Sequence, residues 1–171
     1  MKRLTVPLKK EQISSLKAGD EVLLTGIIYT ARDQAHKRLT CSLRLPLKLR
    51  DQIIYYCGPT NTPRGKAIGS CGPTTSSRMD KFTPKLLKAG LRGMIGKGSR
   101  SKDVLTAIKK HKAVYFLAPA GCGALLAKRV KSAKVIAYKF LGPEAVRKLE
   151  VKDFPLIVGI DSNGRSIYGK K

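Results

Sequence analysis

Apolar residues occur along this chain in short runs separated by turn-forming residues, a pattern typical of proteins that alternate strands and helices. Runs rich in β-branched and aromatic residues predict strands at 21–30, 53–56, 93–96, 113–118, 134–138 and 154–161. A short strand is also expected at 4–8, and an Asn163-Gly164 turn is expected to lead into a last extended segment at 166–168.

Between these runs, apolar residues recur at the three- and four-residue spacing of a helix face. The spacing predicts helices at 9–16, from Asp33 to about Pro46, and at 79–91, 101–111, 121–127 and 143–149. Asp33 and Ser101 are expected to cap the second and fourth of these helices, and Pro143 suits the first turn of the last. Because strands and helices alternate and no linker divides the chain, we predict a single compact α/β domain over residues 1–171.

The loop that follows the strand at 53–56 contains a short internal repeat. Cys57–Thr60, with the sequence CGPT, recurs fourteen residues later as Cys71–Thr74. The repeat is too short to be the unit of a repeat architecture. We expect it to form two turns that lie side by side at the ends of two strands.

The charge of the chain changes the range of functions to consider. Lys and Arg number 35 against 11 Asp and Glu, a formal net charge of +24. Such an excess suits nucleic-acid binding, but it also suits a solvated surface that attracts small anions. The basic residues are scattered and no nucleic-acid-binding motif accompanies them, so a basic nucleic-acid-binding module is kept as the remote alternative. An excess of Lys also suits a thermophilic source.

The cellular compartment is expected to be the cytoplasm. The charged residues near Met1 are not followed by an apolar stretch, which argues against a signal peptide. No run of roughly eighteen apolar residues occurs, so no membrane-spanning helix is expected.

The chain's cysteines are expected to be reduced and not to bind metal on their own. No secretory signal accompanies the four of them, and their spacing matches no zinc or ferredoxin pattern. They are Cys41, Cys57, Cys71 and Cys122.

Basic and hydroxyl-bearing side chains follow three of the predicted strands or their loops. Arg32 follows the strand at 21–30, Thr74 and Arg78 follow the second CGPT loop, and Lys97 closes the strand at 93–96. Sites in α/β sheets form beyond the carboxyl ends of the strands, and an Arg can hold a carboxylate with two parallel hydrogen bonds. These residues could therefore form a receptor for a small dianion, although three ordinary solvent-facing loops would leave the same pattern.

Three segments resemble, in the same order, the β subunit or C-terminal domain of the class I fumarate hydratase and tartrate dehydratase family. They are Gly26–Arg38, Ile68–Asp80 and Met94–Gly98, and Leu149–Pro155 is also similar to the fumarase side of that family. The resemblance extends over nearly the whole chain, from about residue 19 to residue 168, and its middle segment is long and specific.

The resemblance implies a swivelling β/β/α fold and an iron–sulfur hydro-lyase that catalyses the reversible hydration of fumarate to L-malate. It implies a 4Fe–4S cluster whose cysteine ligands lie in a partner α subunit, so that no metal ligand is expected in this chain. The implied assembly is an α2β2 heterotetramer, active only with its α subunit. An L-tartrate dehydratase or mesaconate hydratase β subunit remains the alternative, because the motifs do not distinguish these substrates.

The resemblance also implies roles for individual residues. Arg32, Arg78 and Lys97 match the substrate-binding cations, and Thr74 matches the residue proposed as the catalytic base. A threonine hydroxyl is a poor base unless nearby cations lower its pKa, and Arg78 or Lys97 would have to do so.

Overall fold

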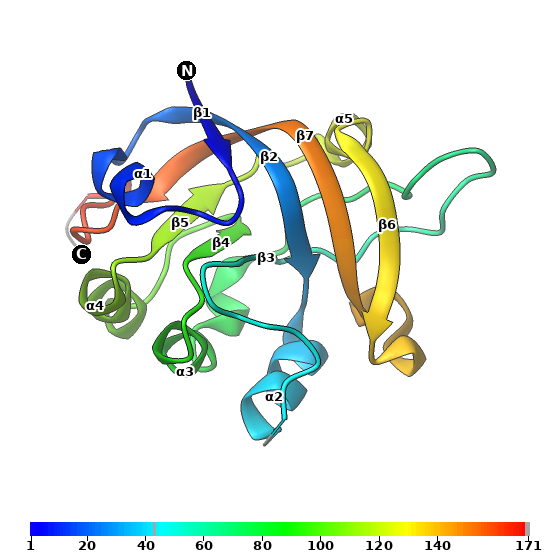
Figure 1. Ribbon diagram of the computed structural model, residues 1–171, viewed down its shortest axis with the longest axis horizontal. Helices are drawn as coiled ribbons and strands as arrows, with labels where there is room; N and C mark the ends of the chain where they lie inside the picture. The colour runs from blue at the N-terminus through cyan, green and yellow to red at the C-terminus, as the bar shows by residue number, and fades with distance from the viewer. Residues whose placement is uncertain (43, 170–171) are drawn as a thin grey trace.

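The computed structural model describes residues 1–42 and 44–169, and its strands form one mixed sheet (Figure 1). The sheet has seven strands in the order β1-β2-β3-β4-β5-β7-β6, and β2 also pairs with β7. This extra pairing closes β2, β3, β4, β5 and β7 into a ring, with β1 and β6 attached outside it. The strands are β1 Lys2–Thr5, β2 Glu21–Thr30, β3 Ile53–Tyr55, β4 Gly93–Gly96, β5 Val114–Leu117, β6 Val130–Ala137 and β7 Val146–Ile160.

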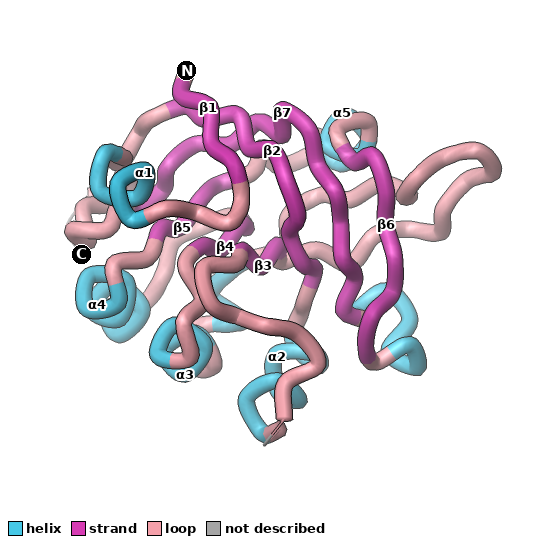
Figure 2. The backbone as a smooth tube through the Cα atoms, in the orientation of Figure 1, coloured by secondary structure: helices cyan, strands magenta, loops and turns pink. Residues whose placement is uncertain are grey.

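Helices connect the strands, and Figure 2 shows α2, α3 and α4 along the same side of the sheet. Two 3₁₀ segments, η1 and η2, precede α3 and β7, and η2 contains a kink at Gly142. The bounds are α1 Lys10–Ser15, α2 Asp33–Cys41, η1 Ser76–Met79, α3 Thr83–Lys88, α4 Lys102–His111, α5 Gly123–Ala127 and η2 Lys139–Glu144.

Two hydrophobic clusters lie on the two faces of the sheet, and β3 contributes to both. Ile53 and Tyr55 pack into the cluster that also contains residues of α1 and β7. Ile54 and Tyr56 pack into the cluster beneath α2, α3 and α4. Because successive strand side chains point to opposite faces, a short run that is apolar throughout fits a strand buried on both sides.

A bulge in β2 bends the strand so that it can meet three neighbours. The register with β7 shifts between Leu24 and Gly26. Gly26 has a φ of 126°, and a Cβ there would come within 2.9 Å of the Val6 carbonyl oxygen. A glycine in a strand commonly marks such a bulge or close approach. The bend lets β2 pair with β1 near its start and with β3 at its end.

The strands β2, β3, β4 and β5 run parallel to one another. Their carboxyl ends therefore lie along one edge of the sheet, called the carboxyl edge below. The long loop between β3 and η1 leaves this edge and extends well away from the sheet (Figure 1). The candidate site residues all lie in chain segments that come after the strands end at this edge.

The helix expected at 143–149 is wrong. Residues 139–144 form η2, and β7 begins at Val146. Val146 and Leu149 are buried with two more exposed residues between them, a spacing that also fits a helix face, and the alternation typical of a strand begins only at Leu149. This segment pairs with β2 on one side and with β6 on the other, so neighbouring strands decide its conformation.

Several other boundaries differ from expectation. The helix expected at 79–91 is shorter: η1 ends at Met79, and only Thr83–Lys88 form α3, with Pro84 in its first turn. Asp33 is the first residue of α2 and Arg32 is its N-cap, whereas Ser101 caps α4 as predicted by accepting a hydrogen bond from the Val104 N–H. Leu43, expected on the face of the helix that begins near Asp33, lies outside the described residues.

Candidate active site

Thr74 and Lys97 are neighbours on the extension of the sheet beyond its carboxyl edge. The Thr74 N–H donates to the Tyr56 carbonyl at 2.7 Å, and the Lys97 N–H donates to the Thr74 carbonyl at 3.3 Å. The Ser76 N–H in turn donates to the Lys97 carbonyl at 3.0 Å. The loop that follows the second CGPT turn is thus held against the ends of β3 and β4 by backbone hydrogen bonds.

Gly96, the last residue of β4, allows this loop to approach. A Cβ at position 96 would overlap the Ser76 hydroxyl oxygen and come within 2.9 Å of the Tyr56 ring. The Ser76 hydroxyl is itself held, because it accepts a hydrogen bond from the Tyr115 hydroxyl at 2.8 Å. The glycine between Ile95 and Lys97 is therefore required by the close packing of the Thr74–Ser76 loop on the strand.

Arg32 and Arg78 lie on either side of one carboxylate. The Arg78 Nε donates to Asp33 Oδ1 at 2.9 Å. The Arg32 Nε is 3.9 Å from Asp33 Oδ2, an ion pair beyond hydrogen-bond distance. Arg32 comes from the start of α2 and Arg78 from η1, so Asp33 joins two elements that are far apart in sequence.

The Arg32 side chain is mostly buried among polar groups. Its Nη2 is 3.7 Å from Glu144 Oε1, and its Nε is buried without a hydrogen-bond partner. It also packs against the first CGPT turn, because a Cβ on Gly58 would come within 3.0 Å of its Cδ and Nη1. A buried guanidinium nitrogen without a partner is costly, and it is the kind of group that an anionic ligand can satisfy.

His36, which the sequence analysis did not assign to the site, fixes the backbone at Arg32. Its Nδ1 is 2.9 Å from the Arg32 carbonyl oxygen, so Nδ1 carries the proton and donates. Burial lowers the pKa of His36 to about 4. The hydrogen bond to the Arg32 carbonyl raises the pKa, but its effect is smaller than that of burial. The imidazole is therefore neutral at pH 7. The only feature of the sequence that links His36 to the site is its position four residues after Arg32, about one helical turn away.

The four predicted site residues thus fall into two neighbouring pairs. Arg32 and Arg78 share Asp33, and Thr74 and Lys97 share backbone hydrogen bonds. The pairs adjoin at the end of β3, where the Ala31 N–H donates to the Tyr55 carbonyl at 3.1 Å. Convergence of the three charged groups on one anion stays a prediction.

The two CGPT turns lie side by side, as predicted. Cys57 and Cys71 are buried, and their thiols share a hydrogen bond that, together with burial, raises the pKa of Cys57. Cys41 is exposed on α2 and Cys122 is half-buried beside α5. Within residues 1–42 and 44–169, no three His, Cys, Asp or Glu side chains are grouped so that they could hold a metal ion. The cysteines of this chain therefore do not fit an iron–sulfur cluster.

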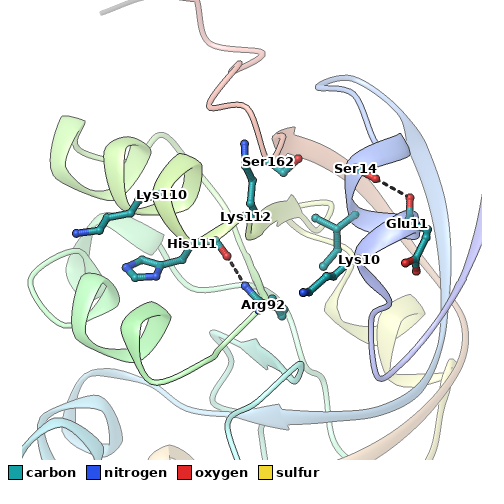
Figure 3. A pocket seen from close by; sticks show the side chains of 9 residues that line it. Lys10, Glu11, Ser14, Arg92, Lys110, His111, Lys112 and Ser162 are labelled. Carbon is teal, nitrogen blue, oxygen red and sulfur yellow. Dashed lines mark hydrogen bonds between the residues drawn. The ribbon is translucent and has the colours of Figure 1, made fainter.

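A cavity of about 610 Å³ lies at the opposite edge of the sheet, near the amino ends of β4 and β5 (Figure 3). Arg92 forms part of its wall and donates to Asp51 Oδ1 at 3.0 Å and to the His111 carbonyl. Burial lowers the pKa of His111, and the nearby Lys110, Arg92 and Lys88 lower it further. In Figure 3 the Lys110 and His111 side chains point away from Lys10, so the basic groups do not converge on one ligand.

Among the helices that the structure describes, none is long and apolar enough to cross a bilayer.

Comparison with known proteins identifies the family. Residues 2–171 match the family described as Fumarase C-terminus. A protein of Methanocaldococcus jannaschii named "Putative L(+)-tartrate dehydratase subunit beta" is 42% identical, over 94% of this chain and 88% of its own length. The L(+)-tartrate dehydratase subunit beta of Escherichia coli is 36% identical, over 99% of this chain and 87% of its own.

Fumarate hydratases are matched over a smaller part of their length. The aerobic class I fumarate hydratase of Escherichia coli is 38% identical over 96% of this chain, which spans 32% of that enzyme. The chain belongs to the Fumarase C-terminus family of the class I fumarate hydratases and tartrate dehydratases, and it corresponds to their β subunit.

Proposed function

We propose that this chain is the β subunit of a hydro-lyase that catalyses the reversible hydration of fumarate to L-malate. The observation that carries the proposal is the pair of arginines, Arg32 and Arg78, held on one carboxylate at the carboxyl edge. Thr74 and Lys97 are anchored beside them by backbone hydrogen bonds. Cations and a hydroxyl collected at one edge suit a small dicarboxylate.

In this proposal, Arg32, Arg78 and Lys97 bind a substrate carboxylate. When malate loses the proton next to that carboxylate, negative charge develops on the carboxylate oxygens. Fixed cations stabilise such charge because they are already oriented when it appears. The terminal nitrogens of an arginine can hold two carboxylate oxygens at once, which also orients the carbon that loses its proton.

Thr74 is proposed to accept that proton. Both the N–H and the carbonyl of Thr74 make backbone hydrogen bonds, so the backbone that carries the hydroxyl is held in one position. A threonine accepts a proton as its alkoxide, so the hydroxyl must first lose its own proton, and nearby cations favour this by lowering its pKa. Lys97, which is bonded to Thr74 through the backbone, and Arg78, four residues further on, are the cations available for this.

The rest of the proposed enzyme lies outside this chain. We assign the 4Fe–4S cluster to an α subunit in a cytoplasmic α2β2 assembly, because the cysteines of this chain do not fit a cluster. The proposed fold is the swivelling β/β/α type, as one domain over residues 1–171. Neither nucleic acid nor membrane is part of the proposal.

The second candidate is an L-tartrate dehydratase, and a mesaconate hydratase is a further variant of the same chemistry. What favours tartrate is the length of the matching relatives, since this chain spans 88% and 87% of the two tartrate dehydratase β subunits. The same cations would bind the carboxylate of either substrate, so the residues of the proposed site do not decide between them.

The experiment is steady-state kinetics of the assembled enzyme with malate, fumarate, tartrate and mesaconate. The preferred substrate should show the highest kcat/KM, and Arg78→Lys should lower that value by about tenfold or more, because a lysine cannot bind a carboxylate through two nitrogens. Arg92→Lys is the matched control, since Arg92 also pairs with an aspartate through its Nε but lies at the opposite edge. Turnover of none of the four acids, or equal losses in the two variants, would reject the proposal.

A further inference from the structure

We infer that Asp33 is the positioning residue of the proposed site: its carboxylate sets the arrangement of Arg32 and Arg78. This inference rests on the proposed function, because it concerns the two arginines proposed to bind the substrate. It adds a third residue that acts through them and does not itself bind the substrate.

The contact between Asp33 and Arg78 leaves the substrate-binding end of the arginine open. Asp33 Oδ1 accepts from the Arg78 Nε at 2.9 Å. The two terminal nitrogens of Arg78 make no hydrogen bond to any residue that the structure describes. These are the nitrogens that bind a carboxylate end-on. Asp33 therefore orients Arg78 without competing for the same nitrogens.

Arg78 needs such an anchor more than Arg32 does. Its side chain is 51% exposed, compared with 23% for Arg32. A long, half-exposed side chain loses much rotational freedom when it is held in one place. The described residues offer Arg78 no other ion pair, so Asp33 is what restrains it.

The second carboxylate oxygen of Asp33, which accepts no hydrogen bond, faces Arg32. Asp33 Oδ2 and Arg32 Nε are both buried without a hydrogen-bond partner and are 3.9 Å apart. Glu144 lies on the other side of Arg32, and its Oε2 accepts the Gln34 N–H at 2.9 Å, which ties it to the first turn of α2. Arg32 is thus bracketed by two carboxylates near the start of one helix.

Asp33 lies where a helix favours a negative charge. It is the first residue of the helix, where the unpaired backbone N–H groups favour a negative charge. An ionised Asp33 beside two guanidiniums could act in a second way, by cancelling part of their charge. Its removal would then strengthen binding of any anion, whereas loss of positioning should weaken binding of the substrate. The two effects have opposite signs and can be separated.

The test compares Asp33→Ala and Asp33→Asn in the assembled enzyme. Asp33→Ala should raise KM by about tenfold with a smaller change in kcat, because the arginines remain present but no longer lie in the binding geometry. Asp33→Asn keeps an oxygen that can accept from the Arg78 Nε, so it should recover part of the loss. Asp51→Asn is the control, since Asp51 Oδ1 accepts from the Arg92 Nε at 3.0 Å at the opposite edge.

A second readout does not depend on activity. In the isolated subunit, the ¹⁵N–¹H signal of the Arg78 Nε should shift in Asp33→Ala, while the signal of the Arg92 Nε stays in place. An unchanged or lowered KM in Asp33→Ala, or an unchanged Arg78 signal, would overturn the inference. If Arg78→Lys itself left kcat/KM intact, the proposed function would fail instead, so the two failures are distinguishable.

Discussion

At the scale of the residue, the site is decided by which polar groups have partners and which do not. Arg32 Nε, Asp33 Oδ2 and His36 Nε2 are buried without hydrogen bonds, and they come from one stretch at the start of α2. Buried polar atoms of this kind are rare because each one costs free energy. Three in one segment make the start of α2 a candidate for contacts with a ligand or a partner subunit.

The role of Thr74 can be tested by separating kcat from KM. Thr74→Ala should lower kcat by about 100-fold or more and leave KM nearly unchanged, because a proton acceptor acts in the transition state and not in substrate binding. Thr74→Ser keeps a hydroxyl and should retain part of the rate. Thr75→Ala is the matched control, since the neighbouring Thr75 is exposed. Near-normal kcat in Thr74→Ala would assign the proton acceptor to the partner subunit.

The buried His36 predicts a loss of stability in acid. Burial lowers its pKa from 6.5 to about 4 in the folded protein, so the unfolded chain binds a proton first as the pH falls. The contribution of His36 to stability is therefore complete above pH 6.5 and is lost between pH 6.5 and pH 4. The loss amounts to about 3 kcal/mol.

Denaturant unfolding of the isolated subunit at several pH values measures this effect. His36→Gln has no titrating group, so its free energy of unfolding should fall less steeply over the same interval. Carboxylates titrate in both proteins, and the difference between the two slopes isolates the histidine. Parallel slopes would contradict the prediction.

At the scale of the element, the carboxyl edge depends on close approach between strands and loops. β4 ends in Gly96, and the Thr74–Ser76 loop packs on it with no room for a side chain. The same edge holds the two CGPT turns through the buried Cys57 and Cys71. Short parallel strands thus serve mainly to place loops whose geometry is set by backbone contacts.

Gly96→Ala tests this dependence on close approach. The new methyl group would push the Ser76 hydroxyl and the loop outward, at a cost of about 1–3 kcal/mol in stability. Activity of the assembled enzyme should fall further than stability alone explains, because Thr74 and Lys97 would move apart. The double variant Gly96→Ala with Ser76→Gly removes the overlap with the Ser76 side chain but keeps the contact with the Tyr56 ring, so it should recover part of the activity. Thermal unfolding and kcat/KM of both variants provide the measurement, and a fully active single variant would contradict it.

At the scale of the whole molecule, a ring of strand pairings supports the carboxyl edge. β7 closes the ring by pairing with β2 along most of its length and with β5 at its end. This closed sheet is a rigid support for the residues at the carboxyl edge. Within residues 1–42 and 44–169, the cysteines are not grouped so that they could bind an iron–sulfur cluster.

The isolated subunit should therefore be colourless and inactive. Anaerobic treatment with iron and sulfide should give no stable cluster absorbance, because Cys57 and Cys71 are buried and the other two thiols lie elsewhere. The same treatment of the subunit mixed with an α subunit should give both absorbance and turnover of a dicarboxylate. A stoichiometric cluster on this chain alone would contradict the division of labour.

Local sequence patterns were sufficient for much of the fold. The strands at 21–30 and 93–96 begin and end where the pattern predicted, and Ser101 caps its helix as expected. These features depend on residues within one or two turns of each other, so they can be recognised without the rest of the chain. The motifs around Arg32, Arg78 and Lys97 likewise indicated the family directly.

Other features depended on contacts between distant residues, and only the tertiary structure decided them. Residues 146–149 read as a helix, yet they form a strand because β2 and β6 pair with them on both sides. The placement of Asp33 between two arginines requires α2 and η1 to meet, and no spacing in the sequence specifies that meeting. The sequence by itself determined the family and predicted which residues bind a dicarboxylate. Long-range packing determined how those residues are held, because backbone pairing and buried charges act between segments that are neighbours only after folding.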